Sequence, residues 1–488
     1  MRFFPEYEEI EKIAKCGEYK VAPVALEILS DFTTPIEVMR ILKTASKHCF
    51  MLESARADDK WGRFSFLGYD PKLEITCTGG EMHIGDRTVK TVNPSEKLRE
   101  IMAEYKAPVI DGVPPFAGGL VGYFSYDYLH YSEPAIKCEA KDSESFKDVD
   151  LMLFDKVIAF DNMKQKIILI ANYRINDGKA AYDKAKEELL NIRELLVNGK
   201  KDTQTAGRLT GEVTPMFSKE KYCEMVEAAK DHIKEGDIFQ IVLSNRLSAP
   251  FEGSLFDTYR VLRTINPSPY MFYFAGLDVE VAGASPETLV KLENGVLHTF
   301  PLAGTRPRGT TDEEDKRLEE ELLADEKELA EHNMLVDLGR NDLGRVSRFG
   351  SVEVEELHSI ERYSHVMHIG STVRGVIRED KDAFDAIEAV LPAGTLSGAP
   401  KIRACQIIEE LEDDKRGIYG GAIGYVDFSG NMDTCIAIRI AYKKNGQVFV
   451  RSGAGIVADS VPEKEYQECI NKAKAVIRAL EQGSELGE

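Results

Sequence analysis

The chain has 488 residues, a formal net charge of −21 at pH 7, 43% hydrophobic residues and 30% charged residues. This length is about two to four domains' worth of chain, and the composition is ordinary for a globular enzyme. The negative charge disfavours binding to nucleic acid or to anionic membrane surfaces, so we expect neither partner. An anionic substrate would have to be held by local donors or by a metal ion.

The sequence has no apolar run of about 18 residues, and its N-terminus turns acidic at once. We therefore expect neither a transmembrane helix nor a secretory signal. Eight cysteines are scattered along the chain, and none forms a C-x-x-C pair. This pattern favours reduced thiols in a cytoplasmic protein over zinc clusters or a disulfide framework.

The first half of the chain ends in an amphipathic helix, predicted near 178–198 and stopped by Gly199. The polar segment that follows has no apolar periodicity, which is typical of a linker. We therefore divide the chain into an N-terminal region, 1–205, and a catalytic region, 215–488.

The catalytic region begins with a helix predicted near 219–235, with Ser218 as its N-cap and Gly236 as its stop. Short strands follow, for example at 239–243 and 270–274. Strands and helices do not alternate strictly. We therefore predict an α+β fold in which large antiparallel sheets pack as a sandwich flanked by helices.

A long helix is predicted near 312–338, with an acidic first half and an apolar second half. Glu331 lies on the stripe of Leu335 and Leu338 at helical spacing, and Glu328 lies one turn earlier on the same side. A carboxylate on a buried face needs a cation or strong donors. On the pattern alone, a partnered structural carboxylate or an exposed helix side is the favoured explanation.

Three loops rich in small residues stand out at 303–305, 394–400 and 453–455. Glycine lets a backbone approach a ligand closely, and successive amides can hold an anion. Ordinary turns explain most such glycines, so each loop alone is a weak signal. His365 and His368 lie near one another in the sequence, and a structural role is the alternative for each.

The strand predicted at 434–441 places Arg439 on a face of small side chains, where a ligand would have room. A guanidinium there could bind a carboxylate through two hydrogen bonds, or it could form an internal ion pair. The last helix is predicted near 461–481, opened by a capping box at Ser460. Glu468 points away from the apolar stripe of this helix, towards either solvent or a cavity.

Several sequence blocks occur in an order that resembles the chorismate-utilising enzymes, and their anthranilate synthase component I branch in particular. The blocks lie at 236–240, 266–271, 283–287, 302–309, 331–338, 394–401, 419–421, 433–436 and 453–457. They span about 215–482, whereas the N-terminal half carries mainly the 52–54 segment. The resemblance identifies the chain as a member of this family.

The resemblance implies that the substrate is chorismate, a dianion, bound with the help of Mg²⁺. By motif position Glu331 and Glu468 resemble the metal ligands, with Glu328 close by. Glu287 resembles the general acid, which would protonate the departing ring hydroxyl, and His368 resembles a histidine of the second step. The positions that resemble substrate-binding residues are Gly304, Thr305, Thr395, Tyr419, Arg439, Gly453, Ala454 and Gly455.

Two positions discriminate between relatives within the resembling family. Relatives that add water carry a lysine base where Gln240 aligns, and aminodeoxychorismate synthases carry a nucleophilic lysine at the position of Ala303. Both departures favour direct addition of ammonia, followed by loss of pyruvate to give anthranilate. None of the cysteines lies in a Gly-x-Cys-x-Gly elbow, so we expect a separate glutamine amidotransferase subunit to supply ammonia.

A further resemblance concerns feedback control by tryptophan. Its implied residues are Glu53, Ser54, Pro269, Tyr270 and Met271. A strand end and a Pro-Ser-Pro turn are the plain alternative. Two other functions stay open for the whole chain: an aminodeoxychorismate synthase component I, and a non-enzymatic paralogue that only binds tryptophan or a partner.

Overall fold

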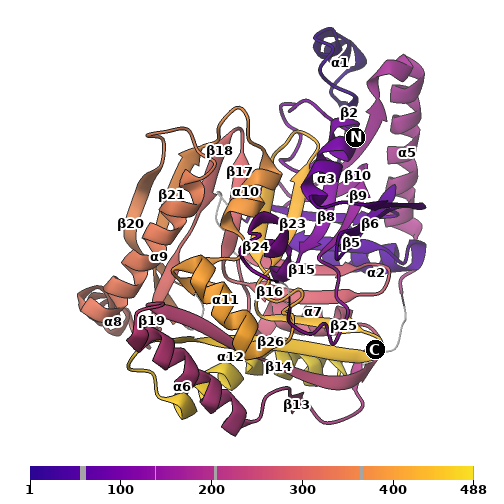
Figure 1. Ribbon diagram of the computed structural model, residues 1–488. Coiled ribbons are helices and arrows are strands. Elements are labelled where there is room, and N and C mark those ends of the chain that lie inside the picture. The colour runs from indigo at the N-terminus through magenta and orange to yellow at the C-terminus, as the bar shows by residue number, and fades with distance from the viewer. Residues whose placement is uncertain (55–61, 138, 203–205, 363–365, 487–488) are drawn as a thin grey trace.

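The computed structural model describes residues 1–54, 62–137, 139–202, 206–362 and 366–486. They form two large sheets with helices around them (Figure 1). The pairings between named strands are antiparallel, for example β14 with β26 and β8 with β23. The predicted α+β class with antiparallel sheets is therefore confirmed.

The larger sheet has 14 strands. In spatial order these are β1 (Arg2–Phe4), β2 (Val21–Leu29), β11 (Lys166–Arg174), β10 (Lys156–Asp161), β4 (Phe64–Tyr69), β3 (Cys49–Glu53), β15 (Tyr270–Ala275), β16 (Glu280–Ser285), β25 (Ile440–Lys444), β26 (Gln447–Ile456), β14 (Gln240–Glu252) and β12 (Arg208–Leu209), with β13 (Thr214–Pro215) and β22 (Gly398–Ala399) also paired to β14.

The second sheet has 12 strands. In spatial order these are β19 (Leu302–Pro307), β21 (Val366–Val376), β18 (Val296–Thr299), β17 (Thr288–Glu293), β24 (Met432–Ile436), β23 (Ala422–Asp427), β8 (Gly119–Phe124), β9 (Val149–Phe154), β5 (Leu73–Thr78), β6 (Glu81–Ile84) and β7 (Arg87–Lys90), with β20 (Glu353–Arg362) also paired to β21.

Both sheets join the N-terminal and C-terminal halves of the chain. The larger sheet is joined where β3 pairs with β15, and the second sheet where β8 pairs with β23. We call these two pairings the seams. Aromatic side chains from both sheets, such as Phe50, Phe272 and Tyr425, pack into one buried cluster between them. That cluster is the centre of the predicted sandwich.

Helices cover the outer faces of the sandwich. They are α1 (Tyr7–Ala14), α2 (Pro35–Ala45), α3 (Pro94–Ala103), α4 (Leu129–Ser132), α5 (Gly178–Asn198), α6 (Lys219–Glu235), α7 (Phe256–Ile265), α8 (Asp312–Ala324), α9 (Glu326–Gly344), α10 (Ala383–Val390), α11 (Lys401–Glu412) and α12 (Pro462–Gly483), with short 3₁₀ turns η1 (Tyr126–Tyr128), η2 (Ile175–Asp177) and η3 (Gly394–Leu396).

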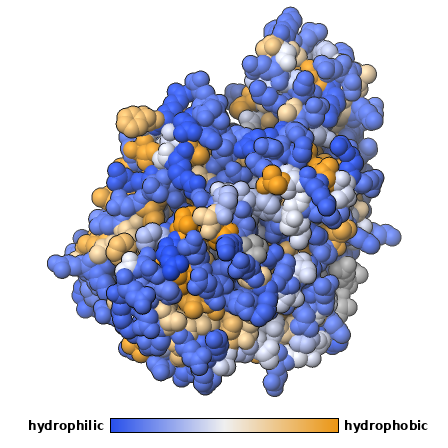
Figure 2. Space-filling model, in the orientation of Figure 1, coloured by the Kyte–Doolittle hydropathy of each residue, from blue (hydrophilic) through white to orange (hydrophobic). Residues whose placement is uncertain are grey.

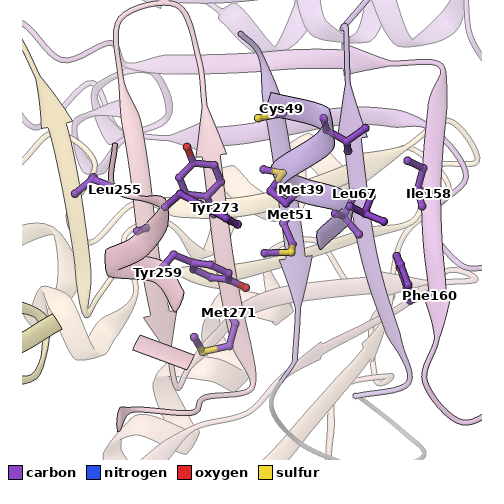
Figure 3. Packing of buried hydrophobic residues seen from close by; sticks show 14 of the residues in the cluster. Met39, Cys49, Met51, Leu67, Ile158, Phe160, Leu255, Tyr259, Met271 and Tyr273 are labelled. Atoms are coloured by element: carbon purple, nitrogen blue, oxygen red, sulfur yellow. The ribbon is translucent and has the colours of Figure 1, made fainter. Parts of the chain in front are cut away.

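The helix-covered face of the larger sheet has its own apolar core. Met51 on β3 and Met271 and Tyr273 on β15 lie on the same face of the sheet as Tyr259 of α7 (Figure 3). Leu480 of α12 belongs to the same cluster. The surface in Figure 2 is mostly hydrophilic, as the high content of charged residues predicts. None of the described helices is both long and apolar enough to cross a lipid bilayer.

Two of the predicted helices are confirmed with their bounds and one is not continuous. Helix α5 spans Gly178–Asn198, and α6 spans Lys219–Glu235 with the Ser218 hydroxyl accepting from the Lys221 amide at 3.2 Å. The helix predicted at 312–338 is instead two helices, α8 and α9, divided at Asp325. The Asp325 carboxylate accepts from the amides of residues 327 and 328 and so begins a new helix.

A predicted strand and a predicted helix cap differ from the structure. The strand predicted at 434–441 is wrong: β24 ends at Ile436 in one sheet, and β25 begins at Ile440 in the other. The capping box at Ser460 is also wrong, because Val461 is the N-cap of α12 and no side chain caps it. The seven cysteines that the structure describes are free. His365 and residues 203–205 of the linker lie outside the described residues.

Candidate functional site

A cavity of about 610 Å³ lies among β19, β26, α9, α12 and η3. Its wall includes the predicted catalytic and metal-binding residues, and the predicted substrate-binding residues except Ala454. They come from separate stretches of the catalytic region: Glu287, Gly304, Thr305, Glu328, Glu331, His368, Thr395, Tyr419, Arg439, Gly453, Gly455 and Glu468. A volume of this size is typical of small-molecule sites.

Glu287 lies in the connection between β16 and β17, at one side of the cavity. The Thr395 hydroxyl of η3 donates to its Oε1 at 2.9 Å, and the Ile436 amide donates to its backbone carbonyl at 3.0 Å. Burial raises the pKa of the Glu287 carboxyl to about 7, although Thr395, Arg439 and Lys472 act to lower it. This carboxyl is therefore partly protonated near neutral pH, as a general acid requires.

His368 of β21 lies directly opposite Thr305 of β19 in the sheet register. Its Nδ1 lies 3.0 Å from the Gly304 carbonyl and 3.0 Å from the Thr305 hydroxyl. Burial lowers the pKa of His368, and Arg439 lowers it further, while the bond to Gly304 acts in the opposite direction. The imidazole is therefore neutral at pH 7, and Nδ1–H donation to the Gly304 carbonyl makes Nε2 its basic nitrogen.

Gly304 sits at an irregular point of β19, where the register with β21 shifts between Ala303 and Thr305. Its φ is +69°, and a Cβ at this position would lie 3.2 Å from Glu328 Oε2. Glycine is needed for both reasons: the left-handed backbone and the closeness of the carboxylate. The small-residue loop at 303–305 therefore brings backbone close to one of the predicted metal carboxylates.

Arg439 lies in the crossover between the two sheets and has a φ of +53°. The sequence pattern predicted it within a continuous strand, and that placement is wrong. The chain bends sharply here, because the Ile438 amide bonds to the Ile436 carbonyl at 2.9 Å. Arg439 nevertheless lines the cavity. The correction therefore concerns its secondary structure and not its place in the site.

Gly453 and Gly455 of β26 also line the cavity. A Cβ on Gly453 would lie 2.7 Å from the Leu243 carbonyl and 3.1 Å from the Tyr419 hydroxyl. Only glycine therefore leaves room at this point. Ala454 does not line the cavity, because its side chain is fully buried in the cluster around α6 and α11. Its backbone alone could serve a ligand.

The three predicted metal carboxylates face the cavity from two helices, Glu328 and Glu331 on α9 and Glu468 on α12. Enclosure by the cavity raises the pKa of Glu331, and the negative charges of Glu328 and Glu468 raise it further. Arg306 donates to Glu328 Oε1 at 3.3 Å, and Lys472 lies 2.8 Å from Glu468 Oε1. The negative charges around Glu331 make these three carboxylates a candidate cation site.

The three carboxylates do not form a closed cage. Across the part of the chain that the structure describes, the group of three potential ligands whose donor atoms all lie within 4.8 Å is His232, Glu235 and Asp237. That group is on the surface near the end of α6, and Asp237 is engaged by His232 and Arg403. The glutamates Glu328, Glu331 and Glu468 are more widely spaced around their shared cavity.

Sequence reasoning missed three basic residues that also line the cavity: Lys327, Lys472 and Arg451. Lys472 donates to the Gly453 carbonyl at 3.1 Å, so it connects α12 to the glycine segment. Lys472 follows Glu468 by four residues, so both lie on one face of the helix. That spacing could have indicated Lys472 as a cavity residue. Arg451 carried no such signal, because it lies inside an apolar strand.

A second cavity, of about 670 Å³, contains all five residues predicted for tryptophan. Glu53 and Met271 are register partners across the seam between β3 and β15, and both side chains turn to the helix-covered face. There Glu53 is engaged by Tyr259 and Arg263 of α7. Tyr270, Phe272 and Leu52 turn the other way, towards the space between the sheets.

The two cavities are connected by hydrogen bonds. The Tyr270 hydroxyl of the second cavity lies 2.9 Å from the Thr288 hydroxyl and donates to Asp433 at 2.8 Å. Thr288 immediately follows Glu287, and the Ser285 hydroxyl donates to the Ile436 carbonyl at 2.7 Å. A displacement of Tyr270 would therefore reach the segment that carries Glu287.

Comparison with known proteins identifies the class of protein that this fold and cavity define. The family model for the chorismate binding enzyme matches residues 47–478, so the chain belongs to that family. Its curated relatives include anthranilate synthase component 1 of Acetivibrio thermocellus, 46% identical over 99% of this chain and 100% of that protein. The same protein of Aquifex aeolicus is 46% identical over 97% of each chain.

A solved structure agrees with this classification. Anthranilate synthase component I from Streptococcus pneumoniae superposes with a TM-score of 0.77 at 38% identity, covering 92% of this chain and 98% of that one. The likeness extends over both halves of the sandwich and is not confined to the catalytic region.

Proposed function

We propose that the chain converts chorismate and ammonia into anthranilate and pyruvate. The observation that carries the proposal is the single cavity that gathers Glu287, Arg439 and the three glutamates of α9 and α12. Gln240 and Ala303 line the same cavity, where relatives that add water or use a covalent step carry lysines. The names of the full-length relatives support the same activity.

Proton delivery in this proposal belongs to Glu287. Ammonia adds at C2 of the ring as the C4 hydroxyl leaves, and a hydroxyl leaves readily only when it is protonated. A carboxyl with a pKa of about 7 holds that proton at neutral pH and can still release it. The Thr395 hydroxyl orients the carboxyl by binding its Oε1.

We assign the second step, in which pyruvate is lost and the ring becomes aromatic, to a base in the same cavity. His368 suits this role because burial keeps it neutral. Its Nδ1 bond to Gly304 fixes the ring and directs the basic Nε2. Arg439, Tyr419 and the amides of the 453–455 segment would hold the substrate carboxylates.

We further propose Mg²⁺ as the cofactor, held by Glu331 and Glu468 with Glu328 nearby. Carboxylate oxygens are the donors that Mg²⁺ prefers, and the like charges of these three glutamates would be balanced by a divalent cation. Bound Mg²⁺ would act as an electrophile and template for a substrate carboxylate.

We propose that ammonia comes from a separate glutamine amidotransferase subunit, because no cysteine of this sequence lies in a Gly-x-Cys-x-Gly elbow. We also propose a division of labour along the chain. Region 215–488 contributes the residues of the catalytic cavity described above. Region 1–205 contributes Glu53 and Ser54 to the second cavity.

We propose that the second cavity binds tryptophan as a feedback inhibitor. Its volume suits an amino acid, and its wall combines aromatic, proline and polar side chains such as Tyr270, Pro269 and Ser54. The bonds from Tyr270 to Thr288 and Asp433 give such a ligand a physical connection to the catalytic acid. The effect would be a coupling between two sites, measurable as inhibition.

Product analysis tests the proposed activity. The purified chain is incubated with chorismate, a magnesium salt and an ammonium salt, and the products are separated and quantified. We expect fluorescent anthranilate and an equal amount of pyruvate. Aminodeoxychorismate without pyruvate would instead indicate the alternative synthase, and isochorismate would indicate water addition. Glu287→Gln is the matched control, because it keeps the side-chain size and should lose about 100-fold or more in kcat.

A further inference from the structure

A buried cluster of charged side chains adjoins the catalytic cavity, and one of its members, Arg451, lines the cavity wall. No step above uses this cluster. It consists of Glu412 at the end of α11, Arg416 in the segment that follows α11, Arg451 of β26 and Ser244 of β14. Each is at most 2% exposed. Burying charges is costly unless each one is paired and hydrogen-bonded. We therefore ask what function this cluster serves.

Glu412 is the centre of this charged cluster. It accepts hydrogen bonds from the Ser244 amide at 2.8 Å and the Ser244 hydroxyl at 3.0 Å. It also accepts from Arg416 at 2.6 Å and from Arg451 at 2.7 Å. Burial acts to raise its pKa, but the two guanidiniums outweigh burial and the pKa of Glu412 is lowered. The carboxylate is therefore charged and fully engaged.

The other donors of Arg416 reach backbone of the cavity wall. Its guanidinium donates to the Leu396 carbonyl at 2.6 Å and to the Val242 carbonyl at 2.8 Å. Leu396 and Val242 both line the cavity. Leu396 is the last residue of η3, the turn that presents Thr395 to Glu287. One side chain thus connects the turn beside the catalytic acid to strand β14 of the cavity wall.

The aromatic surroundings of Arg416 and the net charge of the cluster also connect the cluster to the catalytic cavity. The Arg416 guanidinium lies 4.6 Å from the ring centre of Tyr126 and 5.9 Å from that of Tyr419, a cavity residue. Two guanidiniums face one carboxylate, so the cluster itself carries one net positive charge. A positive charge beside the cavity suits a site that holds an anion.

We propose that Arg416 is a positioning residue for the reaction: it fixes η3 against β14 so that Thr395 meets Glu287, while Glu412, Ser244 and Arg451 hold its guanidinium in place. This inference rests on the proposed function, because it assigns Arg416 to the geometry of the acid in that reaction. Arg416 acts through the turn and does not itself contact the reacting atoms.

A double-mutant cycle tests the inference with Arg416→Lys, Thr395→Val and their combination. Lysine keeps the charge, but its donors all lie on one nitrogen and cannot span the separate carbonyls and carboxylate that the planar guanidinium reaches. We expect Arg416→Lys to lower kcat about 100-fold, because small displacements of catalytic groups have effects of this size. We also expect the alkaline limb of its pH profile to move upward. The double variant should be little slower than Thr395→Val, because both act on one contact.

The matched control is Arg246→Lys. Arg246 of β14 is another nearly buried arginine and pairs with buried Asp414 at 2.9 Å, but it does not line the cavity. We expect this control to lower the thermal midpoint while leaving kcat and the pH limb unchanged. The inference is overturned if Arg416→Lys behaves like the control, or if the Arg416 and Thr395 effects multiply in the double variant.

A milder substitution keeps the test decisive if Arg416→Lys does not fold. Ser244→Ala removes one hydroxyl that links Arg451 to Glu412 and leaves every charge in place. We expect a smaller fall in kcat with the same upward shift of the limb, and no shift would overturn the inference. A different product from the unmodified chain would contradict the proposed function alone, and the same cycle would then be measured on that product. An inactive unmodified chain would overturn both.

Discussion

Replacing Thr395 by valine removes one hydrogen bond from the catalytic acid and keeps the side-chain shape. The Thr395 hydroxyl donates to Glu287 Oε1 at 2.9 Å, and this bond stabilises the charged form of the carboxyl. A hydrogen bond to a charged group is worth about 1.5–3 kcal/mol. Part of it survives in the protonated form, so the difference between the two forms is about 1.4 kcal/mol, or about one pKa unit.

The direction of the pKa shift depends on which form of the Glu287 carboxyl loses more when the Thr395 hydrogen bond is removed. Because the carboxylate loses more than the carboxylic acid, the pKa of Glu287 rises from about 7 towards about 8 in Thr395→Val. The acid then stays protonated to higher pH. We therefore expect the alkaline limb of kcat to move upward by about one pH unit, with a lower maximum because Glu287 is less well oriented.

The assay is anthranilate fluorescence at saturating chorismate and magnesium across the pH range. Free ammonia is held constant at each pH, because ammonium also titrates. Thr434→Val serves as the control: its buried hydroxyl donates to the Val290 carbonyl at 2.7 Å, outside the cavity. A limb that stays in place in Thr395→Val, or moves to lower pH, would refute the reasoning.

Two further predictions concern the metal and the effector. Glu331→Gln should raise the magnesium concentration needed for half-maximal activity by at least about tenfold, the loss typical even of an indirect metal contact. Normal activity of Glu331→Gln at limiting magnesium would contradict the metal assignment. Glu326→Gln, on the same helix, is the control. Ser54→Phe should fill the second cavity and relieve inhibition by tryptophan while kcat stays unchanged, measured as inhibition curves for both proteins. Inhibition identical to that of the unmodified chain would remove Ser54 from the effector site.

Sequence patterns predicted the helices whose ends are set by neighbouring residues. Helices α5 and α6 follow the apolar period and end at glycines, and the Ser218 cap forms as its residue type suggests. The break at Asp325 was missed because aspartate has two local uses. Its carboxylate can sit on a helix surface or cap a new helix, and only the packing of α9 decides between them.

The misplaced strand at 434–441 has a different cause. Its alternating apolar pattern suits a strand on either sheet, and nothing local reports that the chain crosses from one sheet to the other. The crossover gives Arg439 a left-handed backbone that β-branched neighbours do not suggest. Its place in the cavity followed from the resemblance and not from the strand pattern. The Glu412 cluster likewise joins residues from three separate stretches, so no short motif indicates it.

The seams between β3 and β15 and between β8 and β23 have a consequence for the catalytic region by itself. Without residues 1–205, the apolar strands Tyr270–Ala275 and Ala422–Asp427 would each present a bare row of backbone donors and acceptors to water. Long apolar strands with open edges associate with one another. The solubility of the catalytic half therefore depends on strands encoded far upstream, so selection for a well-behaved enzyme also constrains sequence that never touches the substrate.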